Sequence, residues 1–285
     1  MQLILGHNQF IGISHLSQDR GREREKRFSN VQNIHAVAET ASALGYRNMI
    51  VETHPRMLEF LEYYEENQTF TMNFYLQVPY VQGYVQKMNQ NGMRGLISEV
   101  IGRTGLVGAG SIALTSAFNL IKRDYVSVAL SNLKLEIAPF AKFDIKAVIL
   151  HNVLTDLLMA LEVRDVFSEY VEFVSSKLKL QPGLGTLNFK LTTDNLKTWG
   201  IRPAFVMTPV NVKGFDMNPS KVTVDAAIRD YDGNVVAMNV LGGGAYTLAD
   251  SAAYVNSFDN VTHCVVGAST REHLQELKDV FAPST

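Results

Sequence analysis

Short apolar runs alternate with longer segments of helical period along most of this chain. Runs of strand length predict strands at Leu3–Leu5, Met49–Glu52, Met72–Val78, Ala147–Leu150, Leu184–Leu187, Ala204–Met207, Val235–Val240 and Thr262–Val266. Amphipathic segments predict helices at Val31–Leu44, Pro55–Glu66, Thr115–Phe140, Leu154–Leu178, Thr192–Trp199, Pro219–Arg229, Leu248–Phe258 and Arg271–Phe281. Pro55 and Pro219 suit first helical turns, and Gly45 and Gly200 suit helix ends. This alternation predicts an α/β fold, a (β/α)8 TIM barrel in one domain over 1–285, with a doubly wound open sheet as the alternative.

One connection is too long for an ordinary link between a strand and a helix. Roughly seventy residues separate the third predicted strand from the fourth, which predicts a helical insertion at about 80–140. Gly105, Gly108 and Gly110 lie in it, but no convincing strand precedes them, so a dinucleotide-binding loop is not indicated. The insertion follows a strand's carboxyl end, where it could cover the barrel mouth, and a packing or oligomer role is equally open.

Polar side chains follow the apolar run of nearly every predicted strand. The first run, in "LILGHNQFIG", stops at His7 and Asn8, and the second stops at Glu52 and His54. Because strand carboxyl ends converge at one face of a barrel, these side chains predict a site there. We expect Glu52, His151, His7 and His54 to be catalytic, and substrate to contact Asn8, Gln77, Asn152, Asn188, Asn211 and Asn239. For any one of them the alternative is a hydrogen-bonded structural role.

Composition and charge narrow the classes of partner. The chain has 285 residues, a net charge of -2 and a sequence pI of about 6.4, so no overall field favours nucleic acid or an anionic membrane. No apolar run approaches the ~18 residues that span a bilayer. The single cysteine, Cys264, lies in an apolar run, which predicts a buried thiol and suits a reducing compartment. We therefore expect a cytoplasmic protein whose partner is a small molecule, and homo-oligomer formation stays open.

Three stretches carry a family resemblance: "IKAVILHN", "LGTLNFKLTTDNLKTWGIRPAFVMTPVNVKGFDMNPS" and "VVGASTREHLQELKDVF". They resemble the aldo/keto reductase-like barrels over most of residues 145 to 281, and more loosely over 1 to 55. The resemblance implies a fourth strand that ends in a histidine, here His151, and an eighth strand that leads into a cofactor-phosphate helix.

The redox residues of that family are incompletely matched. The family uses Asp, Tyr, Lys and His, whereas this chain has Glu52 at the Asp position, Gln77 at the Lys position and no Tyr at the expected distance. The resemblance therefore implies changed chemistry. We expect robust NADPH oxidation with common aldehydes to be absent.

Two glycine-rich turns predict a site for an anion. Gly242, Gly243 and Gly244 follow the seventh strand, while Ser269 and Arg271 precede the last helix. Glycines let backbone N–H groups approach a ligand, and a helix N-terminus attracts negative charge, so this pair of turns predicts phosphate or cofactor binding. The alternative is two tight turns that need positive φ.

Four functional hypotheses follow. The leading one is acid–base catalysis by Glu52 and His151 on a small polar metabolite that is phosphorylated or sugar-like. The second is NAD(P)H-dependent reduction with altered catalytic residues. The third is hydrolysis or isomerisation with a divalent metal bound by His7, Glu52, His54 and His151. The fourth is a non-catalytic ligand sensor. The cofactor, NAD(P)H or a metal, is left open.

Overall fold

Eight parallel strands pair in chain order, and the last pairs with the first. The computed structural model describes residues 1–13, 18–80 and 130–282. Its strands are β1 (Gln2–Leu5), β2 (Asn48–Glu52), β3 (Asn73–Val78), β4 (Ile145–Leu150), β5 (Gln181–Gly185), β6 (Phe205–Pro209), β7 (Asn234–Met238) and β8 (Val261–Val266). Gln2 lies opposite His263 and Leu5 opposite Val266, which closes the barrel. The predicted (β/α)8 barrel is confirmed, and the open sheet is excluded.

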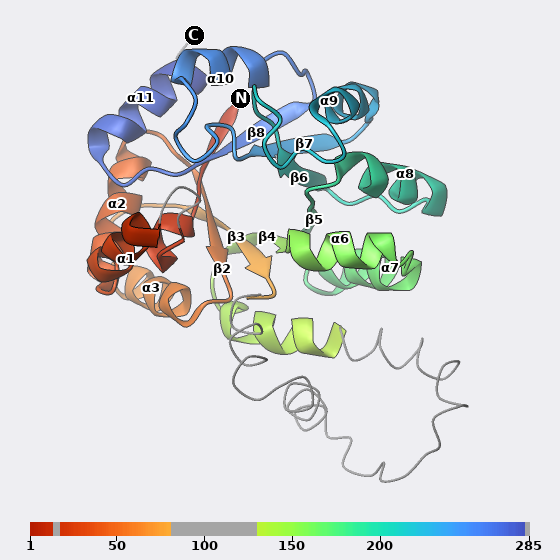
Figure 1. Cartoon of the computed structure of the whole chain (residues 1–285). Coiled ribbons are helices and arrows are strands. Elements are labelled where there is room, and N and C mark those ends of the chain that lie inside the picture. The colour runs from red at the N-terminus through yellow and green to blue at the C-terminus, as the bar shows by residue number, and fades with distance from the viewer. Residues whose placement is uncertain (14–17, 81–129, 283–285) are drawn as a thin grey trace, which may run out of the picture.

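Helices surround this barrel (Figure 1). They are α1 (Gln18–Arg27), α2 (Val31–Ala43), α3 (Pro55–Glu66), α6 (Asn152–Ala160), α7 (Arg164–Glu172), α8 (Phe189–Trp199), α9 (Lys221–Asp230), α10 (Leu248–Val255) and α11 (Arg271–Phe281). Short turns of helix are η1 (Asn8–Ile11), η2 (Ala138–Phe140) and the π-helical η3 (Phe173–Lys177), and residues 130–137 are also helical. Side-chain caps begin several of them: Asn30, Ser220, Thr247 and Thr270 each accept a backbone N–H of the first turn.

Alternation of side chains along each strand separates two apolar clusters. The larger packs between the strands and the helices, and the smaller fills the barrel interior with Ile4, Ile50, Ala147, Ile149, Phe205, Met207 and Val236. Gly183 on β5 leaves room for the Phe205 ring, because a Cβ at Gly183 would lie 2.4 Å from that ring. The interior is therefore a packed core, and chemistry is confined to its ends.

Three sequence predictions differ from the structure. The helix predicted over Leu154–Leu178 is divided into α6 and α7, because Glu162 adopts a left-handed backbone with a φ of 52°. The fifth strand is Gln181–Gly185, whereas the prediction placed it at Leu184–Leu187. The pattern missed its first residues because "QPGLG" lacks the β-branched residues that indicate a strand. Helix α9 begins after Ser220, whose side chain caps it, so Pro219 lies outside its first turn.

Most of the predicted insertion, residues 81–129, lies outside the described residues, as do Gly105, Gly108 and Gly110. Cys264 is completely buried, as predicted, and burial raises the pKa of its thiol. Among the helices that the structure describes, none combines the length and apolar character that crossing a membrane requires.

Candidate active site at the barrel mouth

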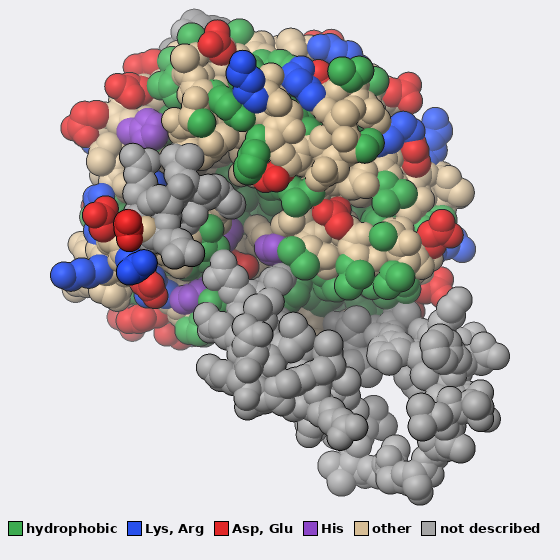
Figure 2. Space-filling view, in the orientation of Figure 1, with side chains coloured by type: hydrophobic (Ala, Val, Ile, Leu, Met, Phe, Trp, Pro, Cys, Tyr) green, Lys and Arg blue, Asp and Glu red, His purple; other side chains and the backbone are tan. Residues whose placement is uncertain are grey.

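The carboxyl ends of the first four strands bring the predicted histidines and Glu52 to one end of the barrel. Figure 2 shows imidazole and carboxylate side chains in the hollow at the centre of this face. Glu52 and Gln77 lie opposite each other at the ends of β2 and β3, and both side chains are buried. His151 follows β4 directly, and its backbone N–H donates to the carbonyl of Val78 on β3 at 2.6 Å. Strand register thus assembles residues that are far apart in the sequence.

The direct partner of Glu52 is His7. His7 Nε2 lies 3.4 Å from Glu52 Oε2, and the two side chains are 7% and 5% exposed. Two buried groups that can exchange a proton are therefore held together where the barrel core ends. Gln9, which follows His7 and Asn8 in the sequence, has a structural role, because its amide donates to the carbonyls of Gly6 and Ala268.

His54 and His151 are both helix caps, which fixes their neutral tautomer. His54 Nδ1 accepts the backbone N–H of Arg56 at 3.0 Å, and His151 Nδ1 accepts that of Val153 at 3.2 Å. A nitrogen that accepts carries no proton, so the neutral ring holds its proton on Nε2 and can donate it there. Helix capping thus presents two imidazole N–H donors near the buried His7–Glu52 pair.

Burial decides the charge state of His151. The pKa of His151 is lowered from 6.5, first by burial; the Glu52 carboxylate raises it by less, and His7 lowers it further. The pKa of His54 is also lowered, by burial first and then by Arg56. The sequence hypothesis paired Glu52 with His151, but no direct contact joins these two described residues. Near neutral pH both capping histidines are uncharged donors.

Tyr80 is a mouth residue that the sequence analysis missed. Its ring packs edge-on against His54 with 4.8 Å between ring centroids. Burial raises the pKa of the Tyr80 phenol, and the charges of Glu52 and Glu25 raise it further. In the sequence Tyr80 lies three positions after Gln77, in "LQVPY", so its place just beyond a strand end was the available signal.

The predicted substrate-binding amides fall into different environments. Gln77 is buried beside Glu52, Asn152 begins α6 next to His151, and Asn8 lies in η1 after His7. Asn188 caps α8 by accepting the N–H of Leu191. Asn239 has a φ of 53° and donates to Asp216 at 3.4 Å.

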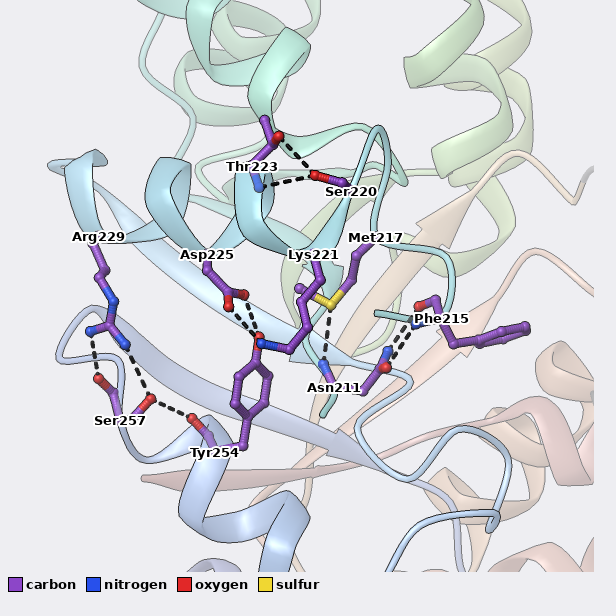
Figure 3. A network of polar contacts seen from close by, with 10 residues as sticks. All are labelled: Asn211, Phe215, Met217, Ser220, Lys221, Thr223, Asp225, Arg229, Tyr254 and Ser257. Carbon is purple, nitrogen blue, oxygen red and sulfur yellow. Dashed lines mark hydrogen bonds and ion pairs between the residues drawn. The ribbon is translucent and has the colours of Figure 1, made fainter. Parts of the chain in front are cut away.

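Asn211 is occupied by its own loop. Its Nδ2 donates to the carbonyl of Phe215 at 2.8 Å, and its Oδ1 accepts the Phe215 N–H at 2.9 Å. Figure 3 shows this pair beside the contacts that join α9 to α10, in which Asp225 accepts from Lys221 and Tyr254. Both ends of the Asn211 amide are therefore engaged, which fits a loop brace better than a substrate contact.

The two glycine-rich turns differ in what they offer an anion. Gly242, Gly243 and Gly244 all have positive φ, and the N–H groups of Gly242 and Gly244 donate to carbonyls within the turn. A side chain at Gly242 would meet the Tyr246 ring at 2.4 Å. These glycines fit the tight-turn alternative better than an open phosphate loop.

The second turn has a cation that the sequence analysis did not assign. Arg27 from α1 donates to the Ser269 hydroxyl at 3.3 Å and to its carbonyl at 3.0 Å. Thr270 caps α11, whose first residue is the exposed Arg271. The Arg27 guanidinium and the N-terminus of α11 therefore meet near Ser269.

The metal hypothesis is not supported by the donor geometry. Within the part of the chain that the structure describes, no three His, Cys, Asp or Glu side chains converge as ligands. Nδ1 of His54 and of His151 each accepts a helix-capping hydrogen bond, which fixes the orientation of each ring. Within the predicted set of His7, Glu52, His54 and His151, the pair in direct contact in the structure is His7 and Glu52.

A cavity of about 560 Å³ lies at the opposite end of the barrel. Its lining includes Gln2, Asn48 and Asn73, whose amides bond to one another, and Lys146, which pairs with Asp144. These groups satisfy each other at the amino ends of the strands, away from the His7–Glu52 pair. We therefore place the candidate site at the mouth, where titratable groups converge.

Comparisons with known proteins find similarity at the level of structure. No protein-family model and no curated protein match the chain. An aldo/keto reductase from Brucella melitensis matches at 12% identity and a TM-score of 0.53, covering 99% of this chain and 89% of its own. A variant of Gox0644 in complex with NADPH matches at 10% identity and 0.56, covering 99% and 83%. The thermostable aldo-keto reductase Tm1743, bound to epalrestat, matches at 10% and 0.58, covering 98% and 88%.

At identities this low, the structural matches establish the fold alone. The closed barrel, the chain order of its strands and these neighbours agree with the resemblance carried by the sequence. The chain therefore has a divergent form of the (β/α)8 barrel fold of the aldo-keto reductases.

Proposed function

We propose that the barrel mouth is the active site of an oxidoreductase that uses NAD(P)H to reduce the carbonyl group of a small polar substrate. The observation that carries the proposal is the convergence of the buried His7–Glu52 pair with the N–H donors of His54 and His151 and the phenol of Tyr80. The aldo-keto reductase neighbours, one of them bound to NADPH, support this choice over a reaction without hydride transfer.

The residues at the start of α11 fit the phosphate groups of such a cofactor. Arg27 and Arg271 would supply positive charge, and the first backbone N–H groups of α11 would supply donors. Such a cofactor, when bound, would supply the hydride. The rest of the reaction depends on groups that this chain supplies.

Two kinds of donor act on the substrate oxygen. The neutral ring of His151, with its proton on Nε2, would donate a hydrogen bond to the carbonyl and orient it. Tyr80, whose ring packs against His54, would give its phenol proton to the oxygen as negative charge develops. The His7–Glu52 pair would then return a proton to the site. This assignment replaces the family's Tyr and Lys with a phenol that follows β3 and a neutral amide, Gln77.

The experiment measures binding first and turnover second. NADPH and NADH are titrated with cofactor fluorescence as the readout, and nicotinamide absorbance is then followed with sugar-like carbonyls, 2-oxo acids and simple aldehydes. The expected result is saturable binding and turnover of polar carbonyls, with little turnover of simple aldehydes. Absence of binding to both cofactors would overturn the proposal.

A second candidate function is acid–base catalysis without a redox step, as in an isomerase or lyase. Gln77 favours it, because an amide beside Glu52 cannot supply the positive charge that a lysine would. Incubating candidate sugar phosphates with the protein in deuterated water distinguishes the two. Deuterium incorporation without cofactor supports the second function, and cofactor-dependent turnover without exchange supports the first.

A further inference from the structure

The Glu136 carboxylate joins the segments that follow β2 and β3. Glu136, in the helix over residues 130–137, accepts the Thr53 hydroxyl at 2.6 Å and the backbone N–H of Tyr80 at 3.1 Å, both through Oε2. Thr53 directly follows Glu52 in the chain. Oε2 of Glu136 therefore links Thr53, the residue after Glu52, to Tyr80.

Among the described residues, this link is the hydrogen bond that restrains the Tyr80 main chain. The Thr53 N–H donates to the Gln77 carbonyl at 3.3 Å, which ties the end of β2 to β3. Beyond β3 the chain leaves the sheet, and among the described residues the Tyr80 N–H has Glu136 as its hydrogen-bond partner. The Tyr80 ring also packs on His54.

We propose that Glu136 is a positioning residue, which fixes the Tyr80 phenol relative to Glu52 and His54 by bonding Thr53 and the Tyr80 main chain at once. This inference rests on the proposed function, in which Tyr80 donates the proton. A donor displaced by about 1 Å can cost a hundredfold in rate. Removing the carboxylate should therefore lower kcat while leaving cofactor affinity unchanged, because Glu136 bonds residues that follow β2 and β3, whereas the proposed phosphate site lies at the start of α11.

A set of variants separates positioning from a general loss of charge or stability. Glu136→Ala removes both bonds and should lower kcat roughly a hundredfold. Glu136→Gln keeps an acceptor oxygen and should recover most of kcat, and Thr53→Val, which removes one bond, should fall between them. Glu62→Gln is the matched control, since Glu62 is an exposed carboxylate whose partner is Lys142. It should leave kcat unchanged.

A readout that does not need turnover tests the same inference. The protein is labelled with 3-fluorotyrosine, and the Tyr80 resonance, one of 11 tyrosine signals, is assigned with Tyr80→Phe. We expect Glu136→Ala to shift the Tyr80 signal and its titration midpoint, with Glu136→Gln close to wild type. An unchanged Tyr80 signal in folded Glu136→Ala overturns the inference. Should Glu136→Ala fail to fold, Thr53→Val must shift the signal, and an unchanged signal there overturns it equally. A shift of the Tyr80 signal without any NAD(P)H turnover would support the positioning role of Glu136 and reject the proposed function.

Discussion

His7 and Glu52 are in contact across the mouth of the barrel, with 3.4 Å between Nε2 and Oε2 and almost no exposure of either side chain. His7 follows β1, and Glu52 is the last residue of β2, so pairing of these two strands brings the groups together. Removal of one partner from a buried pair leaves the other without compensation. The pair can therefore serve the reaction or brace the mouth. Substitution should lower activity in the first case and stability in the second.

Substitution of Glu52 or His151 should remove activity more than stability. Glu52→Gln keeps much of the shape of the side chain but removes the carboxylate that exchanges a proton, and His151→Asn removes the imidazole donor that is proposed to orient the carbonyl. We expect both variants to fold, to bind cofactor and to lose about 10² to 10⁴ in kcat. Steady-state kinetics and thermal unfolding check this. Near-normal kcat with a lowered melting temperature would identify that residue as a structural brace.

Stability should fall as the pH is lowered from neutrality. The pKa of His151 is lowered from 6.5 in the folded protein, so the unfolded chain binds a proton that the folded chain excludes. The free energy of unfolding then has a positive slope with pH, and the contribution present above 6.5 is lost as the pH falls toward the lowered folded pKa. His54 and His263 act in the same direction. Urea unfolding at a series of pH values should show this slope, and His151→Asn should reduce it. An unchanged slope in the variant would contradict the assignment.

Two buried threonines should respond oppositely to the same substitution. The Thr208 hydroxyl has no hydrogen-bond partner among the described residues, so Thr208→Val should stabilise the protein by about 1 kcal/mol or more. The Thr186 hydroxyl donates to Asp156 and contacts the Thr192 hydroxyl at 2.9 Å, so Thr186→Val should destabilise by about 1–3 kcal/mol. Chemical denaturation of both variants measures the difference. Equal losses would show that the Thr208 hydroxyl is satisfied in solution.

Cofactor affinity should depend on the turn before α11. Arg271→Gln or Arg27→Gln removes a cation near Ser269 and should cost about 1.5–3 kcal/mol of NADPH binding, with a weaker salt dependence. Gly243→Val tests the other glycine-rich turn, where φ is 73°. Fluorescence titration of folded variants provides the affinities. If Gly243→Val leaves affinity unchanged while the arginine variants lose it, the anion site belongs to α11 alone; if no variant changes it, the site lies elsewhere.

The sequence by itself determined the barrel and the end of it that carries polar groups. Strand and helix periods alternate strongly enough to predict the (β/α)8 fold, and residues such as Glu52 and His151 directly follow or end apolar runs that must lie in the sheet. Side-chain alternation is a local property, so a linear pattern reveals it. The fifth strand was misplaced because Gly183 is selected by the approach of Phe205, which is not a local property.

Only the tertiary structure decided which mouth residues act on one another. Strand register places Glu52 against His7, and helix capping, which depends on where α6 begins, sets the donor nitrogen of His151. Tyr80 lies in the site because its ring packs on His54 and Glu136, 56 positions along the chain, accepts its backbone N–H. Such partners are tens of residues apart in the sequence. Their distances, burial and proton positions depend on how the elements pack, which a pattern along the sequence does not describe.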